Sequence, residues 1–250
     1  MKKFNKYSES GSYHWKKIDG SIFDFSPRLN ARYDLAIKFS LDNIESNNIR
    51  GLDIGFGDGV VVGKLLKKGI EMYGIEYEKE GVELAKSILL NKGLNVENIR
   101  QGDCYNLEFE DNFFDFVISV EVIEHLEDVN QYLKEIYRVL KPNGVFVCTT
   151  PQRDPGQNDD YVRDPYHVKE YTASELRADL TIVFNDTKVY GAFPKYLDEE
   201  YLKLSSISII NKFHKVWFKI KSKYLSNPYL EAIKLNPTRD FDQLISISKK

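Results

Sequence analysis

Between residues 50 and 150, short apolar runs alternate with stretches in which apolar residues recur at the helical period. Nearly continuous runs such as FFDFVISV are typical of strands that are covered on both faces. The alternation predicts an α/β fold in which a mostly parallel sheet carries helices on both faces. The predicted strands are 49–55, 71–77, 97–102, 113–120 and 145–150, and the predicted helices are 60–68, 79–91 and 130–140.

Beyond residue 150 the pattern loosens. Residues 151–167 are a long polar segment, which is typical of a functional lid, and Thr172 with Glu175 predicts a capping box at the start of a short helix. Two further strands are expected, which makes a Rossmann-like sheet of seven, with a helical insertion before the last strand. The expected parts are an N-terminal helical cap at 1–48, a core at 49–194, an inserted helical lid at 195–236 and the last core strand at 237–250.

Composition narrows the class of protein. The 250 residues include 42% apolar residues, which is enough for an ordinary core, and a net charge of −3 argues against a general nucleic-acid surface. Two cysteines, Cys104 and Cys148, predict buried thiols and no disulfide framework. The chain has neither a secretion signal at its start nor an apolar run of membrane-spanning length, so a cytoplasmic location is expected.

The segment LDIGFGDG (Leu52–Gly59) follows the first predicted strand, where glycines let a ligand approach the backbone. A dinucleotide dehydrogenase requires the spacing G-x-G-x-x-G, but residue 60 is valine, and the glycines here are Gly55, Gly57 and Gly59. Asp53 and Asp58 would disfavour an anionic pyrophosphate, whereas a ligand with a cationic methionine moiety tolerates them. The turn therefore favours S-adenosylmethionine over a dinucleotide.

Two further acidic residues follow predicted strands. Glu76 ends the second strand, where a carboxylate can accept hydrogen bonds from two ribose hydroxyls, and Tyr77 can lie along an adenine face. Asp103 follows the third strand, and its carboxylate, with the backbone N–H of Cys104, can bond the adenine edge. A solvated strand-end acid and a turn-forming aspartate are the alternatives.

Together these segments resemble the class I S-adenosylmethionine-dependent methyltransferases. The resemblance covers Gly51 to about Thr150 and carries the motifs in order: DIGFGDG, GIEY, QGD, FDFVISVEVIEHLED and LKPNGVFVCTTP. It implies cofactor binding by Asp53, Gly55, Gly57, Glu76 and Asp103, and the expected cofactor set is completed by Phe56, Gly59, Tyr77, Cys104, Val120 and Glu121. The resemblance does not identify the methyl acceptor.

The segment EVIEHL leaves the fourth predicted strand. If it winds helically, Glu121, Glu124 and His125 share one face, and with His167 from the long loop they can bind a divalent metal. The segment resembles that of ubiquinone-pathway O-methyltransferases. It also resembles that of the enzymes that methylate the 3′-terminal ribose of small RNAs, and in those enzymes two glutamates and two histidines hold Mg²⁺ or Mn²⁺. Two alternatives stay open: His125 or His167 acts as a general base without metal, or the segment is only structural.

These features predict O-methylation of a hydroxyl on a small-molecule or glycan acceptor. The alternatives are an N-methyltransferase, an RNA ribose methyltransferase, and a non-catalytic sensor or partner subunit that binds S-adenosylmethionine. Arg28 and Arg32 are candidates to pair with the methionine carboxylate or an acidic substrate, or are solvated helix charges. Residues 213–224 mix aromatic and basic residues, and they suit a membrane surface, a polymeric acceptor, a second subunit or a lid packed on the core.

Overall fold

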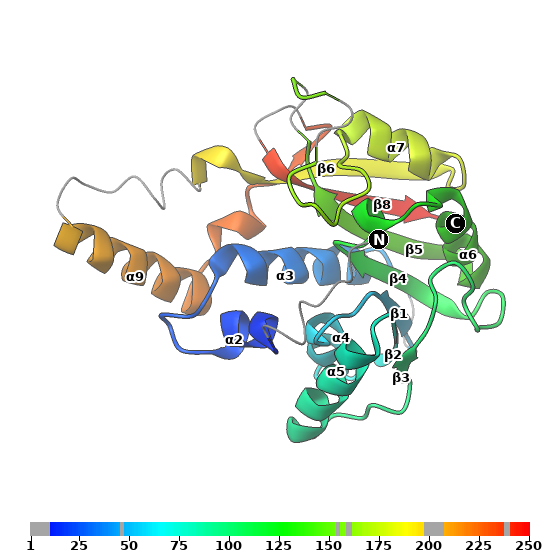
Figure 1. Cartoon of the computed structure of the whole chain (residues 1–250), viewed down its shortest axis with the longest axis horizontal. Helices are drawn as coiled ribbons and strands as arrows, with labels where there is room; N and C mark the ends of the chain where they lie inside the picture. The colour runs from blue at the N-terminus through cyan, green and yellow to red at the C-terminus, as the bar shows by residue number, and fades with distance from the viewer. Residues whose placement is uncertain (1–10, 46–47, 154–155, 159–161, 198–207, 238–240) are drawn as a thin grey trace.

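One sheet organises the part of the chain that the computed structural model describes, which is residues 11–45, 48–153, 156–158, 162–197, 208–237 and 241–250. Its eight strands lie in the order β3-β2-β1-β4-β5-β8-β6-β7 (Figure 1). The strands from β3 to β5 are parallel, whereas β8 runs antiparallel to both of its neighbours and β7 runs antiparallel to β6. The strands are β1 (Arg50–Ile54), β2 (Glu71–Glu76), β3 (Ile99–Gln101), β4 (Phe114–Val120), β5 (Leu140–Pro151), β6 (Asp186–Pro194), β7 (Lys234–Leu235) and β8 (Phe241–Lys249).

Helices cover both faces of this sheet. One face carries α2 (Tyr13–Asp19), α3 (Pro27–Leu41), α4 (Val60–Leu66) and α5 (Lys79–Asn91), and the other carries α6 (Val129–Val139) and α7 (Ala173–Thr181). Between β6 and β8 lie α9 (Ser208–Tyr224) and the short 3₁₀ turn η2 (Pro228–Leu230), and a second 3₁₀ turn, η1 (Ile123–His125), follows β4.

The two faces have separate apolar cores because side chains alternate along each strand. In β4, Phe116 and Ile118 join the core beneath α3, while Val117 between them joins the core beneath α6 and α7. All three side chains are fully buried, which explains why β4 reads as a continuous apolar run.

The predicted Rossmann-like fold and the helical insertion before the last strand are therefore confirmed, and so is the capping box of Thr172 and Glu175. The prediction of seven strands is wrong by one. The additional strand, β7, is only two residues long and pairs with Tyr190 and Gly191 at the sheet edge, so it leaves no periodic pattern in the sequence. The four-part division of the chain stays a prediction.

Two smaller observations complete the comparison. Neither cysteine forms a disulfide, and Cys148 is buried as expected, but Cys104 is only half-buried because it lies in the turn after β3. Among the described residues, no helix combines the length and the apolar character that a membrane span requires.

The strand order reverses between β1 and β4, since β1 continues outward to β2 and β4 continues outward to β5. Ligands of open α/β sheets bind beyond the carboxyl ends of the strands at such a reversal. The glycine turn follows β1 and the EVIEHL segment follows β4. The predicted cofactor site and the predicted metal or base site therefore both lie at this point.

Candidate active site

The glycine turn between β1 and α4 presents backbone rather than side chains. Gly55, Gly57 and Gly59 all have positive φ angles, of 70°, 56° and 80°. A Cβ atom on Gly55 would lie 2.5 Å from Cγ2 of Val122, so the turn packs directly against the EVIEHL segment. Phe56 contributes only its backbone here, because its ring is buried in the core against Gly74.

Glu76 lies behind this turn and holds it in place. Its Oε2 accepts from the Gly57 amide at 2.9 Å, and its Oε1 accepts from the Glu78 amide at 3.1 Å. Burial raises the pKa of the Glu76 carboxyl, while these backbone amides oppose that rise. Each carboxyl oxygen retains acceptor capacity for a ribose hydroxyl.

Asp53 is a second buried acid in the same place. Burial, helped by the nearby Glu76 charge, raises the pKa of Asp53 to about 8. Within the described part of the chain its Oδ2 is buried and accepts no hydrogen bond. Two acids in so small a volume favour a cationic ligand, because a positive charge would restore the ionised form of both.

The remaining predicted cofactor residues are more exposed. Tyr77 is 72% exposed and follows β2, so its ring can form one wall of an open pocket. Asp103 accepts from the Tyr105 amide at 2.8 Å, which holds its carboxylate in the turn after β3. Burial raises the pKa of the neighbouring Cys104 thiol to about 12, and Val120 ends β4 half-buried.

Helix α2 covers the glycine turn through Asp58, a contact that sequence reasoning missed. The Asp58 carboxylate accepts from the His14 amide at 3.0 Å and lies 3.1 Å from the His14 ring nitrogen Nδ1. The indole of Trp15 donates to the Asp58 carbonyl oxygen at 2.7 Å. Asp58 therefore holds α2 against the glycine turn and does not point to a ligand. Its position inside the turn is the only sequence signal that could have suggested this role.

The prediction that Glu121, Glu124 and His125 share one helical face is wrong for Glu121. Its backbone has a φ angle of 58°, which interrupts the helix before η1 begins. Its carboxylate lies 3.1 Å from the Arg32 guanidinium and accepts from Thr149 at 3.0 Å and from Gln243 at 2.5 Å. Arg32 is thus paired with Glu121, and Arg28 is likewise paired with Asp242 at 3.2 Å.

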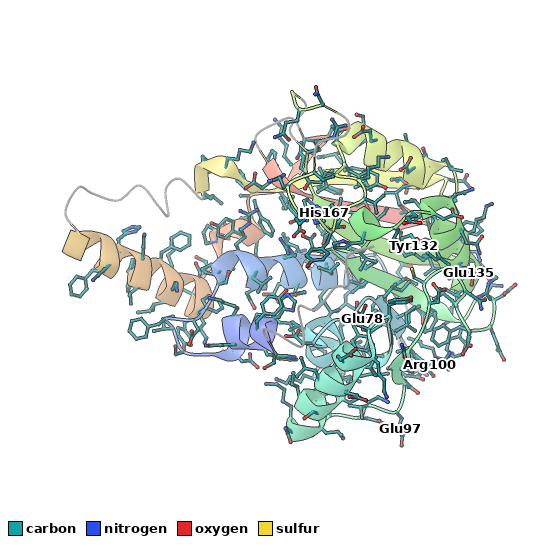
Figure 2. All side chains as sticks on the ribbon, viewed as in Figure 1. Glu78, Glu97, Arg100, Tyr132, Glu135 and His167 are labelled. Atoms are coloured by element: carbon teal, nitrogen blue, oxygen red, sulfur yellow. The ribbon has the colours of Figure 1, made fainter. Side chains whose placement is uncertain are left out.

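Glu124, His125 and His167 do come together. One potential ligand atom from each lies within 4.8 Å of the other two, and the two imidazole centroids are 5.0 Å apart. The carbonyl oxygen of Glu124 accepts from the backbone amides of Val168 and Lys169, so the loop that carries His167 is pinned to η1. Figure 2 labels His167, which comes from the loop between β5 and α7.

Glu124 is the buried member of this cluster. Thr150 donates to its Oε2 at 3.1 Å, and among the described residues Oε1 has no hydrogen-bond partner although it is buried. Burial, helped by the Glu121 charge, raises the pKa of Glu124 well above its ordinary value. A cation beside it would reverse this effect.

Both imidazoles are oriented by neighbours that the sequence did not reveal. His125 Nδ1 lies 2.9 Å from the Tyr166 carbonyl oxygen, and His167 Nδ1 lies 2.9 Å from Oε1 of Glu170. Since a carbonyl or carboxylate oxygen can only accept, each neutral ring donates from Nδ1 and keeps its lone pair on Nε2. Burial lowers the pKa of His125, which keeps that ring neutral near pH 7.

Glu170 is a fully buried carboxylate with three donors. Besides His167, it accepts from the Arg163 amide at 2.8 Å and from the Arg163 guanidinium at 3.2 Å. Burial alone would raise the pKa of Glu170, but the bonds from Arg163 and His167 outweigh it and lower the pKa. Glu170 is three residues from His167 in the sequence, which is the only signal that could have found it.

Comparison with known proteins indicates a methyltransferase domain. Residues 52–148 match the family described as "Methyltransferase domain". A ubiquinone biosynthesis O-methyltransferase of Rickettsia prowazekii is 30% identical over 158 residues, which are 61% of this chain and 59% of that protein. An uncharacterized methyltransferase of Bacillus subtilis, YcgJ, is 36% identical over 138 residues, which are 52% of this chain and 54% of that protein.

A structural comparison extends the similarity beyond the matched domain. Phosphoethanolamine N-methyltransferase 2 of Haemonchus contortus has a TM-score of 0.66 at 20% identity, and the match covers 98% of this chain and 58% of that one. This likeness concerns the fold. The chain spans between a half and two thirds of the length of these curated relatives. Residues 52–148 are thus similar to the methyltransferase domain, and this similarity covers less than half of the chain.

Proposed function

We propose that this protein transfers the methyl group of S-adenosylmethionine to a hydroxyl group of a small-molecule or glycan acceptor. The observation that carries the proposal is the convergence of Glu124, His125 and His167 directly beside the glycine turn. Val122 touches Gly55, so a proton-accepting cluster lies next to the predicted donor pocket.

The donor half binds the cofactor through backbone and buried acids. Glu76 accepts hydrogen bonds from the ribose hydroxyls. Tyr77 and Asp103 lie beside the adenine, and the glycine turn lies along the methionine part of the cofactor. The cationic amino and sulfonium groups of the cofactor favour the ionised form of Asp53 and lower its pKa from about 8.

The acceptor half removes the hydroxyl proton. The acceptor oxygen attacks the methyl carbon, the carbon–sulfur bond breaks, and S-adenosylhomocysteine leaves with the electron pair. The proton passes to Nε2 of His167 or His125, which the contacts of Nδ1 leave as the basic nitrogen. Burial lowers the pKa of His125. If His125 is the base, we therefore expect the midpoint of the acid limb in a profile of kcat/KM against pH to lie below 6.5.

The same three residues fit a divalent cation, with one carboxylate and two imidazoles as ligands. Two nitrogen ligands suit Mn²⁺ better than Mg²⁺. When bound, such a cation would lower the pKa of an acceptor hydroxyl. Glu121, which pairs with Arg32, is outside this set.

An acceptor screen tests the proposal. Purified protein with S-adenosylmethionine is incubated with catechols, sugars and RNA 3′ ends, and S-adenosylhomocysteine and the methylated product are measured by mass spectrometry. We expect an O-methylated product, and we expect His167→Ala to abolish it while His214→Ala, a histidine on α9, leaves it unchanged. A product methylated on nitrogen or carbon would refute O-methylation, and cofactor binding without turnover on any acceptor would favour a sensor.

A chelator separates the two mechanisms. If a metal takes part, chelation lowers activity and added Mn²⁺ restores it in the wild type. Activity that is insensitive to chelator assigns the proton to a histidine alone.

A further inference from the structure

Large apolar side chains gather in solvent on α9 and the segments beside it. Phe23, Phe213, Trp217, Tyr224 and Leu225 are each between 57% and 74% exposed. Phe213, Trp217 and Tyr224 are spaced at i, i+4 and i+11, so they form one stripe along the helix. In Figure 1, α9 projects from one end of the molecule, opposite the end that carries α6. We call these five residues the aromatic face.

Contacts on the other side of α9 determine where this face points. Phe218 and Ser222 are buried, and the Phe218 ring packs edge-on against Tyr229. At 100° per residue they lie roughly opposite the stripe. Lys219 donates to the Phe23 carbonyl oxygen at 2.6 Å and Lys223 donates to that of Gly20 at 2.8 Å, which brings Phe23 alongside α9. The aromatic face is therefore held away from the core.

The helix that carries most of the aromatic face, α9, is strongly basic. Residues 212–224 contain five lysines and no acid, although the whole chain has a net charge of −3. The lysines are Lys212, Lys215, Lys219, Lys221 and Lys223. Lys17 of α2 lies close enough to Lys219 to lower its pKa after burial does, while the nearby acid Asp24 acts in the opposite direction and offsets part of the positive charge.

We propose that the aromatic face docks on an anionic lipid bilayer. Aromatic side chains on a helix that lies in the membrane interface enter the headgroup region, and flanking lysines pair with lipid phosphates. A second copy of the chain is a poorer occupant, because a symmetric contact would bring two copies of the basic helix α9 against each other. The surface goes beyond the proposed methyl transfer and does not depend on it.

Vesicle sedimentation tests this docking. The full chain is mixed with vesicles of about 30% phosphatidylglycerol in phosphatidylcholine and with pure phosphatidylcholine vesicles. We expect binding to the anionic vesicles only, weakening as salt is added. Replacing Phe213 and Trp217 together by serine should weaken binding by about tenfold or more. Ile182→Ser, at a residue that is 70% exposed beyond α7, is the matched control and should change nothing.

Tryptophan fluorescence gives an independent measurement. The chain has two tryptophans, and Trp15 is buried while Trp217 is exposed, so a blue shift on vesicle addition reports Trp217. The shift should disappear in Trp217→Phe. S-adenosylmethionine affinity, measured in every variant, shows that each is folded.

Three outcomes would overturn the proposal. The first is that anionic vesicles do not bind the wild type, and the second is that they bind the Phe213/Trp217 double variant equally well. The third is a dimer or an RNA complex that forms in place of vesicle binding and is lost in the double variant.

Discussion

The donor and acceptor halves of the site are built from different materials. The donor half is mostly one continuous backbone segment, 53–59, held by the carboxylate of Glu76. The acceptor half is made of side chains from segments far apart in the sequence: Arg32 on α3, Glu121 to His125 after β4, His167 and Glu170 in the following loop, and Gln243 on β8. A motif can therefore locate the donor half, because one local backbone segment forms most of it.

The two halves also differ in where most of their acids find charge partners, although Glu124 of the acceptor half resembles the donor acids because burial raises its pKa. In the acceptor half, Glu121 is paired with Arg32, and Glu170 receives bonds from Arg163 and His167. In the donor half, Asp53 and Glu76 are buried together and both have raised pKa values. The donor half thus depends on a cationic ligand for its charge balance, whereas Glu121 and Glu170 obtain theirs from the protein.

The largest effect is expected from Gly55→Ala, which attacks the donor backbone. The added Cβ would meet Val122 at 2.5 Å on a left-handed backbone, so we expect S-adenosylmethionine affinity to fall by about 100-fold, or about 3 kcal/mol. Calorimetry measures the loss. Gly69→Ala is the matched control, because Gly69 has a φ angle of 78° but nothing lies within 4 Å of its Cβ position. An equal loss of affinity in the control would mean that general strain, not the turn, is responsible.

Glu170→Gln tests the acceptor half without touching the donor. We expect kcat to fall by about 30-fold, because His167 loses the carboxylate that orients it, while cofactor affinity stays within about twofold. Glu127→Gln, at an exposed acid near η1, is the control. A parallel loss of cofactor affinity in Glu170→Gln would show that the halves are not separable.

The cofactor-free protein should lose stability as pH rises. The folded pKa of Asp53 is about 8 and its ordinary value is 3.8, so the folded state keeps a proton that the unfolded state releases. This contribution is complete below pH 3.8 and is lost as pH rises through about 8. Between pH 6 and 7 the free energy of unfolding should fall by up to about 1.4 kcal/mol. Urea unfolding at several pH values measures the slope, and Asp53→Asn should flatten it; an unchanged slope would assign it to other groups.

The smallest effect is expected from Tyr77→Ala, at the exposed edge of the donor half. Tyr77 is 72% exposed, so loss of stacking on the adenine should weaken cofactor binding by only about fivefold, or about 1 kcal/mol. Tyr196→Ala, at a tyrosine that is 60% exposed, serves as the control. No change in Tyr77→Ala would remove Tyr77 from the adenine pocket.

The sequence by itself determined the order of strands β1 to β5, the glycine turn and the capping box at Thr172, although β5 begins at Leu140 and not at the expected residue 145. These features are local: apolar periodicity, glycine backbone freedom and side chains three residues apart are all readable along the chain. The two-residue strand β7 escaped because its pairing depends on β6 alone and has no period of its own.

Only the tertiary structure decided which hydrogen-bond and ion-pair partner each polar side chain has. Glu121 contacts Arg32 and Gln243 instead of the two histidines. Its own backbone is left-handed, which directs it away from η1, and α3 and β8 lie within reach of its side chain. Glu170 orients His167 across a three-residue spacing, whereas Asp58 holds α2 through a contact between segments more than 40 residues apart. Hydrogen-bond partners depend on which segments pack together. The polar residues can therefore be identified in the sequence, but their partners follow only from the fold.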